Sequence, residues 1–202
     1  MKKEETLFRE IATDYLGGNN HFTQLNLSEK LSISLSTVNS ALRKISSINA
    51  VQINRRSFSI IAFDRLMMYW ATHRNLQKDI ALQVHAEGRI NEIESLLPNG
   101  IAFTAYTAFK KIYGYTPSDY SEVYVYATAS AIKDIRNRFR SGKGFSNLFV
   151  LETDQILSER IRSGKMEKNS VPIPQAFVDL WNIRSWYAKN FSDAISKKIF
   201  GD

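Results

Sequence analysis

The sequence contains no cysteine and only three histidines among its 202 residues. Without cysteine, the chain has no disulfide, no thiolate nucleophile and no sulfur ligand for zinc. The histidines, His21, His73 and His85, stand far apart and show none of the short spacings of metal-binding helices. We therefore expect neither a metal site nor a cofactor.

Long apolar runs are also missing, because no stretch approaches the ~20 consecutive apolar residues that a membrane-spanning helix needs. The first residues, Met1 to Glu5, lack the apolar core of a signal peptide. We therefore expect a cytoplasmic protein with no membrane partner. Hydrophobic residues make up 44% of the chain, which is enough for packed cores, and the length favours two small domains.

The net charge of +7 fits a nucleic-acid partner, since Lys and Arg that neutralise phosphates supply most of the non-specific affinity for nucleic acids. The excess is spread along the chain. Residues 1–62 carry eight basic and five acidic residues, and residues 63–202 carry nineteen and fifteen. Charge alone therefore does not locate the partner, and the position of the basic residues must do so.

The N-terminal residues predict three helices. Apolar side chains recur at helical spacing from Lys3 to Leu16, and the run Gly17-Gly18-Asn19-Asn20 ends this first helix. Thr23 is a good N-cap for a short second helix that breaks at residues 32–34, and Ser36 is our predicted N-cap for the third. Two short helices joined by a tight turn form a helix-turn-helix pattern.

Two β-prone runs follow, at residues 50–53 and 57–61, and predict a hairpin with Arg55 and Arg56 near its tip. The whole string from residue 27, LSEKLSISLSTVNSALRKISSINAVQINRRSFSII, resembles the winged helix-turn-helix regulators, and the resemblance extends over about Lys3 to Ile61. It implies that the third helix enters the major groove of double-stranded DNA and that the hairpin, or wing, touches flanking phosphates.

The resemblance assigns eight residues to DNA binding: Ser36, Thr37, Asn39, Ser40, Arg43 and Lys44 on the third helix, with Arg55 and Arg56 on the wing. An Asn amide can pair with adenine and an Arg guanidinium with guanine, each through two hydrogen bonds. The alternative is that these residues form only the solvated side of a short helix and a soluble turn.

The rest of the chain alternates strands and helices, which predicts a small sheet with packed helices and an α+β fold overall. We expect strands at residues 80–86, 122–126 and 147–151, and helices at 63–76, 90–97, 103–112, 130–139 and 174–200. The predicted domains are therefore 1–62 for DNA binding, 63–78 as a connecting helix, and 79–202 as an α/β domain for dimerisation, partner binding or effector binding.

Three segments of this half, RLMMYWATHRNL, GIAFTAYTAFKKIYGY and VPIPQAFVDLWNI, resemble the antitoxin repressors of the abortive-infection E type. That family combines a winged helix with an α/β domain, and its partner is a nucleotidyltransferase-like toxin. For this chain we expect an α/β domain with a small sheet and packed helices, and a nucleotidyltransferase-like, non-catalytic fold is one form that it can take. The resemblance implies a transcriptional regulator that represses its own operon and has a toxin as its protein partner.

We expect no enzymatic activity. Nucleotidyltransferases place paired carboxylates, usually Asp-x-Asp, where they bind two metal ions, and this sequence has no Asp-x-Asp. Its nearest pair, Glu92 and Glu94, falls in a predicted helix and reads as a solvated acidic face. The alternative function is a nucleotidyltransferase-like enzyme that uses the winged helix to find its substrate.

Two further surfaces are candidates for partner binding. Lys133, Arg136 and Arg140 recur on one face of a predicted helix, either as a solvated face or as a second contact for phosphates or an acidic partner. The C-terminal aromatics Trp181, Trp186, Tyr187 and Phe191 are our candidate homodimer contact, with packing inside the monomer as the alternative. The tyrosines between residues 106 and 126 line either a ligand pocket or the edge of a core.

Overall fold

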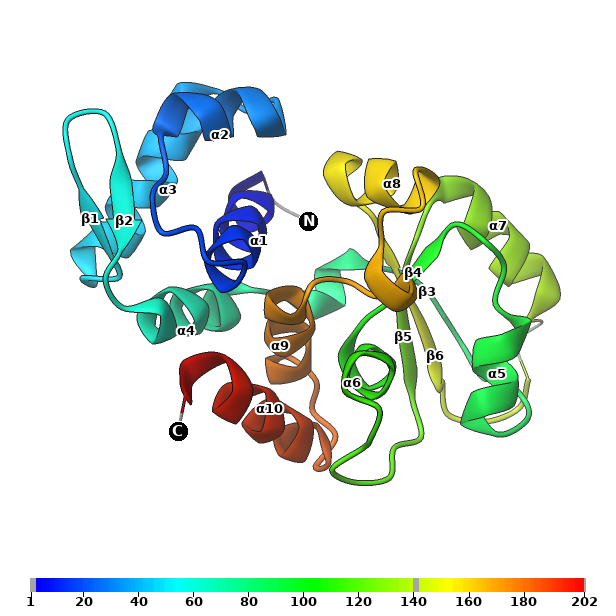
Figure 1. Cartoon of the computed structure of the whole chain (residues 1–202). Coiled ribbons are helices and arrows are strands. Elements are labelled where there is room, and N and C mark those ends of the chain that lie inside the picture. Colours follow the sequence, from blue (N-terminus) through cyan, green and yellow to red (C-terminus); the bar gives the residue numbers. More distant parts are fainter. Residues whose placement is uncertain (1–2, 140–141, 202) are drawn as a thin grey trace. The chain divides into compact units, whose positions relative to one another are not determined.

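A computed structural model describes residues 3–139 and 142–201 of the chain. The fold is α+β, as the alternation of strands and helices predicts, and it divides into two compact units. Unit 1 comprises residues 1–74 together with 196–202, and unit 2 comprises residues 75–195 (Figure 1). The helix at the end of the first stretch, α4 (Phe63–His73), belongs to unit 1.

Unit 1 contains four α-helices, a β-hairpin and a short C-terminal helical segment among its described residues. The helices α1 (Lys3–Leu16), α2 (Gln24–Leu31) and α3 (Leu35–Ser47) precede the antiparallel strands β1 (Val51–Ile53) and β2 (Phe58–Ile60), and α4 follows. The predicted elements are confirmed, and so is Thr23 as the N-cap of α2. The prediction of Ser36 as the N-cap of α3 is wrong. The N-cap is Ser34, whose side-chain oxygen accepts a hydrogen bond from the Thr37 backbone N–H at 3.1 Å.

The core of unit 1 forms where one apolar face of each helix is buried. Side chains from α1, α3 and α4 have almost no exposed area; they include Leu7, Phe8, Ile11, Val38, Leu42, Ile45, Leu66 and Trp70. A buried ion pair joins the end of α4 to α1, with Arg74 Nη1 2.5 Å from Glu5 Oε2. The C-terminal segment η3 (Lys197–Gly201) belongs to the same unit, and the Phe200 ring lies 6.0 Å from that of Phe63.

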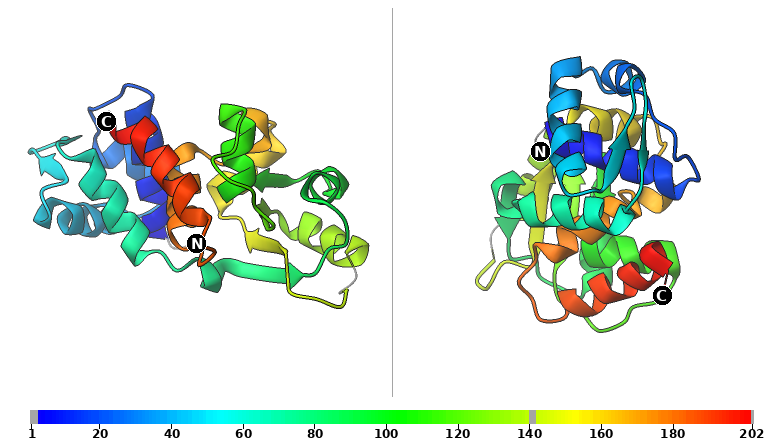
Figure 2. Two further views of the ribbon diagram at one scale, coloured as in Figure 1. Left: turned by 90° about the horizontal axis from the view of Figure 1, so that it is seen from below. Right: turned by 90° about the vertical axis from the view of Figure 1, so that its left-hand side faces the viewer.

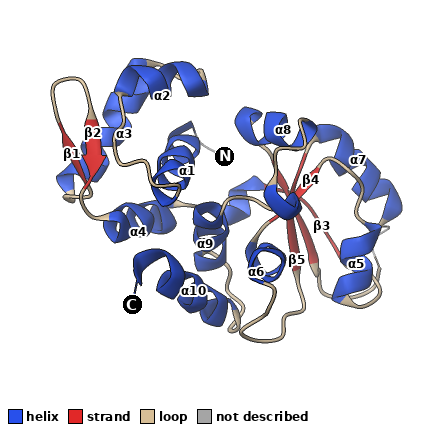
Figure 3. Ribbon diagram, viewed as in Figure 1, coloured by secondary structure: helices blue, strands red, loops and turns tan. Residues whose placement is uncertain are grey.

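Unit 2 is built on a four-stranded mixed sheet in the order β3-β6-β5-β4, whose strands are red in Figure 3. The strands are β3 (Ile80–Val84), β4 (Ile101–Phe103), β5 (Val123–Ala127) and β6 (Leu148–Glu152). β5 and β6 run parallel, and the crossover that parallel pairing requires is made by α7 (Ala129–Arg138). β3 and β4 each pair antiparallel at an edge.

Alternation along β5 gives each face of the sheet its own core. Val123, Val125 and Ala127 pack with side chains of α5 (Ile90–Leu96) and α7. Tyr124 and Tyr126 point to the opposite face, where α6 (Ala105–Tyr113) and α9 (Ile173–Trp181) lie. Because β5 is buried on both faces, it reads as a continuous apolar run.

The remaining elements of unit 2 differ in part from the sequence prediction. The strand β4 was not predicted, because its three residues are too few to show an alternating pattern. The helix α8 (Gln155–Arg162) was also missed, as were the single turns η1 (Leu76–Asp79) and η2 (Glu167–Asn169). The predicted C-terminal helix is two helices, α9 and α10 (Ala188–Ser196), separated by residues 182–187.

The break between α9 and α10 changes the aromatic surface proposed for a dimer. Phe191 is fully buried, and Tyr187 is nearly so, with both rings against the Tyr106 ring inside unit 2. The prediction that these two residues form a dimer contact is therefore wrong. Trp181 and Trp186 are 47% and 77% exposed, so these two indoles alone keep the surface position that the prediction required.

A buried carboxylate ties three elements of unit 2 together. Asp179 on α9 has no exposed area and accepts hydrogen bonds from Thr104 Oγ1 at 2.7 Å and from Tyr126 OH at 3.2 Å. It also accepts one from Gln175 Nε2 at 2.9 Å. Burial of a carboxylate is costly unless its oxygens are satisfied, so this network links α9 to β5 and to the start of α6.

We predict that Asp179→Ala destabilises unit 2 by on the order of 3 kcal/mol, because three buried donors lose their acceptor. Urea unfolding followed by circular dichroism measures the change in unfolding free energy. Asp193→Ala is the control, since its side chain is 54% exposed and its loss should have a small effect. Equal unfolding midpoints for the two variants would contradict the assigned role of Asp179.

The tyrosine cluster predicts a loss of stability in alkali. Burial, followed by the nearby Glu122 carboxylate, raises the pKa of Tyr106 and of Tyr124 far above the ordinary value. An unfolded phenol titrates near ~10, so the stability that the two neutral rings supply is complete below that pH and falls as pH rises above it. In a tyrosinate absorbance titration, some of the nine phenols should ionise only as the protein unfolds. Ionisation of all nine near pH ~10 with the fold intact would disprove this.

Candidate nucleic-acid interface

The exposed side of α3 carries a row of polar side chains. The opposite side of the helix is buried through Val38, Ala41, Leu42 and Ile45, so its amphipathic spacing fixes which residues face outward. Ser36, Ser40 and Arg43 are exposed, and Asn39 is half-buried. Together with Leu35, these four residues line a shallow hollow of about 470 Å³. The structure therefore brings together four of the six residues predicted on this helix.

The other two predicted residues of α3 have different surroundings. The Thr37 hydroxyl lies 2.7 Å from Ser34 Oγ and belongs to the capping turn at the start of the helix. Lys44 pairs with Glu4 on α1, with Nζ 2.9 Å from Oε2, and this hydrogen bond is the main cause that raises the pKa of Lys44. Neither residue lines the hollow.

The hairpin holds Arg55 and Arg56 at its tip. The backbone N–H of Asn54 donates to the Ser57 carbonyl at 2.8 Å, so the two arginines span the turn, and both are exposed. The loop between β1 and β2 projects beyond the helices of unit 1 (Figure 1 and the left view of Figure 2). Within the described part of the chain, Arg43, Arg55 and Arg56 have no carboxylate partner in an ion pair.

Residues before α2 fix the hairpin in place. Phe22 exchanges two backbone hydrogen bonds with Phe58 on β2, at 3.0 and 2.9 Å, and their rings stack at 5.2 Å. The Asn20 amide accepts from the Ile60 N–H at 2.8 Å and donates to the Ile60 carbonyl at 3.2 Å. The sequence prediction treated Asn20 only as part of a helix stop, because its partner lies forty residues away.

Gln24 is a further residue of the candidate interface, and the sequence analysis missed it. It is the first residue of α2, and its Oε1 accepts a hydrogen bond from Asn39 Nδ2 at 3.1 Å. One N–H of the Asn39 amide is therefore held, while its remaining N–H and its oxygen stay available to a partner. The sequence signal that could have pointed to Gln24 was its amide side chain, directly after the Thr23 N-cap.

The second predicted basic face lies on α7 in unit 2. Lys133 and Arg136 are exposed on this helix, whereas Arg140 lies outside the described residues. Two surface hollows lie among the described residues of unit 2. One is lined by Glu94 and Lys111 among others, and the second by Asp119 and Arg89 among others.

Glu94 is not part of a freely solvated acidic face, contrary to our expectation. Its carboxylate accepts from Lys110 Nζ at 2.7 Å, from Thr107 Oγ1 at 2.8 Å and from Tyr120 OH at 3.0 Å. Glu92 instead accepts from the Arg89 backbone N–H at the start of α5. The two carboxylates therefore have separate roles in holding α5.

The described residues were also compared with the requirements of a metal site and of a membrane-spanning helix. Within residues 3–139 and 142–201, no group of three His, Cys, Asp or Glu side chains lies together in a way that could hold a metal ion. In that same part of the chain, each helix is too short or too polar to cross a lipid bilayer.

We predict that Gln24→Ala changes the sequence preference of the interface rather than its general affinity for nucleic acid. Loss of the Gln24 oxygen frees the Asn39 amide to rotate, so discrimination at the contacted base should fall by about 1 kcal/mol, at the lower end of the cost of losing a base contact. Selection of bound fragments from random duplex DNA, followed by binding to matched and mismatched sites, measures the effect. Gln77→Ala, at an exposed position of η1 in unit 2, is the control. A uniform loss across all sequences would contradict a positioning role for Gln24.

Comparison with protein-family models, with curated proteins and with solved structures found no match for this chain. The resemblance to winged helix-turn-helix regulators and to abortive-infection antitoxins therefore stays a prediction. The function has to be argued from the geometry of the site itself.

Proposed function

We propose that unit 1 is a winged helix-turn-helix domain that binds double-stranded DNA. In this proposal α3 is the recognition helix and the β1–β2 hairpin is the wing. The observation that carries it is the hollow on α3, in which Asn39, Ser40 and Arg43 present hydrogen-bonding groups on an otherwise well-packed helix. An α-helix fits the major groove, where such side chains read base edges.

The charge of unit 1 supports a phosphate-bearing partner. Residues 1–74 and 196–202 contain twelve basic and seven acidic residues. Several of the basic side chains are neutralised locally, as in the pairs Lys44–Glu4, Lys30–Asp14 and Arg74–Glu5. Arg43, Arg55 and Arg56 remain exposed, and guanidinium groups bind phosphate well through paired hydrogen bonds.

We further propose that the protein is a transcriptional regulator, a repressor that acts on its own operon as the antitoxin family does. A single small DNA-binding module buries only ~600–1,000 Å² of protein surface on DNA, which favours a second contact through a homodimer or another partner. A toxin as partner follows only from the family resemblance. Fragment selection from genomic DNA tests the regulator directly, since a repressor should enrich promoter regions.

Binding is preferred to catalysis because of how the carboxylates are distributed in unit 2. The alternative nucleotidyltransferase-like enzyme needs two carboxylates facing one open cleft. Of the two hollows described in unit 2, one contains Glu94 and the other Asp119, with a single carboxylate in each. Glu94 is moreover held by Lys110. These two hollows therefore do not supply the paired carboxylates that the enzyme alternative requires.

We predict that Arg55→Gln/Arg56→Gln weakens binding to all duplex sequences alike. Each phosphate contact contributes ~0.9 to the slope of log affinity against log salt, so the slope should shrink by about 1–2 units. A salt series with fluorescently labelled duplexes measures it. The matched control is Lys78→Gln/Lys189→Gln, which removes two exposed charges of unit 2. If both double variants kept the wild-type slope, the hairpin would not be part of the interface.

A further inference from the structure

Residues 142–147, which precede β6, are joined to the end of β3 by side-chain hydrogen bonds. Asn147 bonds to both backbone groups of Ala86: its Nδ2 donates to the carbonyl at 3.0 Å, and its Oδ1 accepts the N–H at 2.7 Å. His85 Nδ1 lies 2.8 Å from the Phe145 carbonyl, which requires the imidazole to donate. The described part of this loop, residues 142–147, therefore has a defined position on unit 2.

Two glycines let the loop lie directly on the His85 ring. A Cβ at Gly144 would come within 2.9 Å of His85 Nδ1 and Cε1, and its φ of +152° disfavours other residues. A Cβ at Gly142 would lie 3.0 Å from His85 Cδ2. The backbone of residues 142–144 therefore contacts the imidazole at a distance that leaves little room for a side chain at either glycine.

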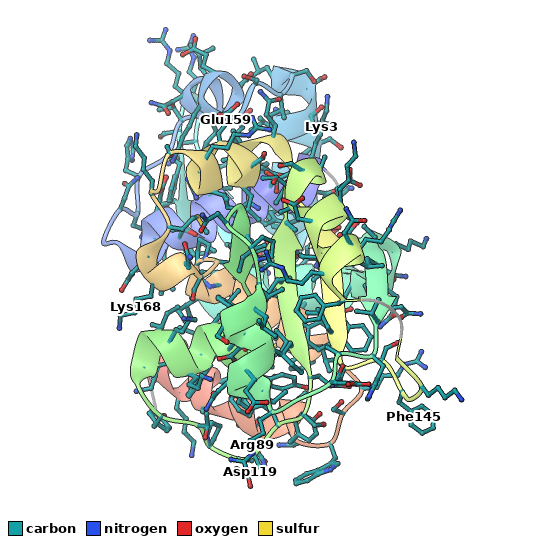
Figure 4. The ribbon with its side chains drawn as sticks, turned by 90° about the vertical axis from the view of Figure 1, so that its right-hand side faces the viewer. Lys3, Arg89, Asp119, Phe145, Glu159 and Lys168 are labelled. Carbon is teal, nitrogen blue, oxygen red and sulfur yellow. The ribbon has the colours of Figure 1, made fainter. Side chains whose placement is uncertain are left out.

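The residue between these anchors is presented to solvent. Phe145 is 97% exposed, more than any other large hydrophobic side chain of the described chain, and it points away from the ribbon (Figure 4). An aromatic ring of this kind contributes nothing to a core. Its hydrophobic area gains free energy only when a partner covers it.

Positive charge in unit 2 is concentrated around this loop. Residues 129–147 contain five basic residues and one acidic residue, Asp134, whereas the rest of unit 2 contains ten basic and twelve acidic residues. Lys133 and Arg136 are exposed on α7, and Lys143 is exposed two residues before Phe145. Arg138 donates to the Leu96 carbonyl. Glu87, also exposed, is the acidic residue that follows the anchoring Ala86 in sequence.

We propose that Lys133, Arg136, Lys143 and Phe145 form a second contact for duplex DNA, here called the α7 loop surface. The three cations bind phosphates, and Phe145 inserts between base steps from the minor groove, as apolar wedge residues do. A single strand is the competing partner, because bases also stack on exposed aromatic rings such as Phe145.

This surface lies wholly within unit 2 and does not depend on the role proposed for α3 and the hairpin. An experiment can therefore contradict one of these two proposals and leave the other standing. The full chain carrying Arg43→Gln, Arg55→Gln and Arg56→Gln should lose affinity but retain weak, salt-sensitive duplex binding through the α7 loop surface.

The charge test compares Lys133→Gln/Arg136→Gln with the Lys78→Gln/Lys189→Gln control in the full chain. Short duplexes of mixed sequence are the probe, over a series of salt concentrations. The first variant should shrink the slope of log affinity against log salt by about 1–2 units, and the control should keep the wild-type slope. Added to the triple variant, Lys133→Gln/Arg136→Gln should weaken the residual binding further, because Lys143 and Phe145 are then the only members of the surface that remain. Equal slopes for both double variants overturn the proposal.

The aromatic test uses Phe145→Ala and Phe145→Trp. Phe145→Ala should weaken duplex binding on the order of tenfold without changing the salt slope, because an apolar contact releases no counterions. Tyr115→Ala, at a ring that is 47% exposed elsewhere in unit 2, is the control and should bind as wild type. In Phe145→Trp, duplex addition should change the indole fluorescence beyond the change seen in wild type. Unchanged fluorescence, or a loss by Phe145→Ala confined to single strands, overturns the wedge.

Discussion

Burial of one face of α3 is the constraint on which the proposed interface depends. Val38, Leu42 and Ile45 have no exposed area, so the helix cannot rotate without exposing its core face. Asn39, Ser40 and Arg43 therefore stay outward, and the pair of Asn39 with Gln24 adds a polar link between α2 and α3. A helix fixed in this way presents the same side chains to every partner it meets, which specific recognition requires.

The hairpin is fixed by a comparable arrangement. Phe22 and Asn20 hold β2 through backbone and side-chain hydrogen bonds, so the turn with Arg55 and Arg56 extends from a supported base. Unit 2 shows the same principle in the loop after α7, where Asn147 and His85 anchor the backbone and leave Phe145 outside. In both units, exposed side chains are carried by backbone that hydrogen bonds from other segments hold in place.

Local sequence was sufficient for most elements. The apolar spacing of α1 and α3, the Thr23 cap and the two β-prone runs of the hairpin each depend on residues within one or two turns of each other. Local sequence was not sufficient where an element is very short or where its helical spacing continues across a break in the chain. β4 has only three residues, and the C-terminal aromatics kept a helical spacing across the break between α9 and α10.

The sequence by itself determined the α+β class, the amphipathic face of α3 and the basic tip of the hairpin, because periodicity and charge are properties of neighbouring residues. Only the tertiary structure decided which candidate side chains are free to contact a partner and which are paired or buried within the protein. Lys44 is paired with Glu4, Glu94 with Lys110, and Tyr187 and Phe191 pack inside unit 2. These outcomes join residues that are distant in the chain, and such contacts exist only once the chain has folded.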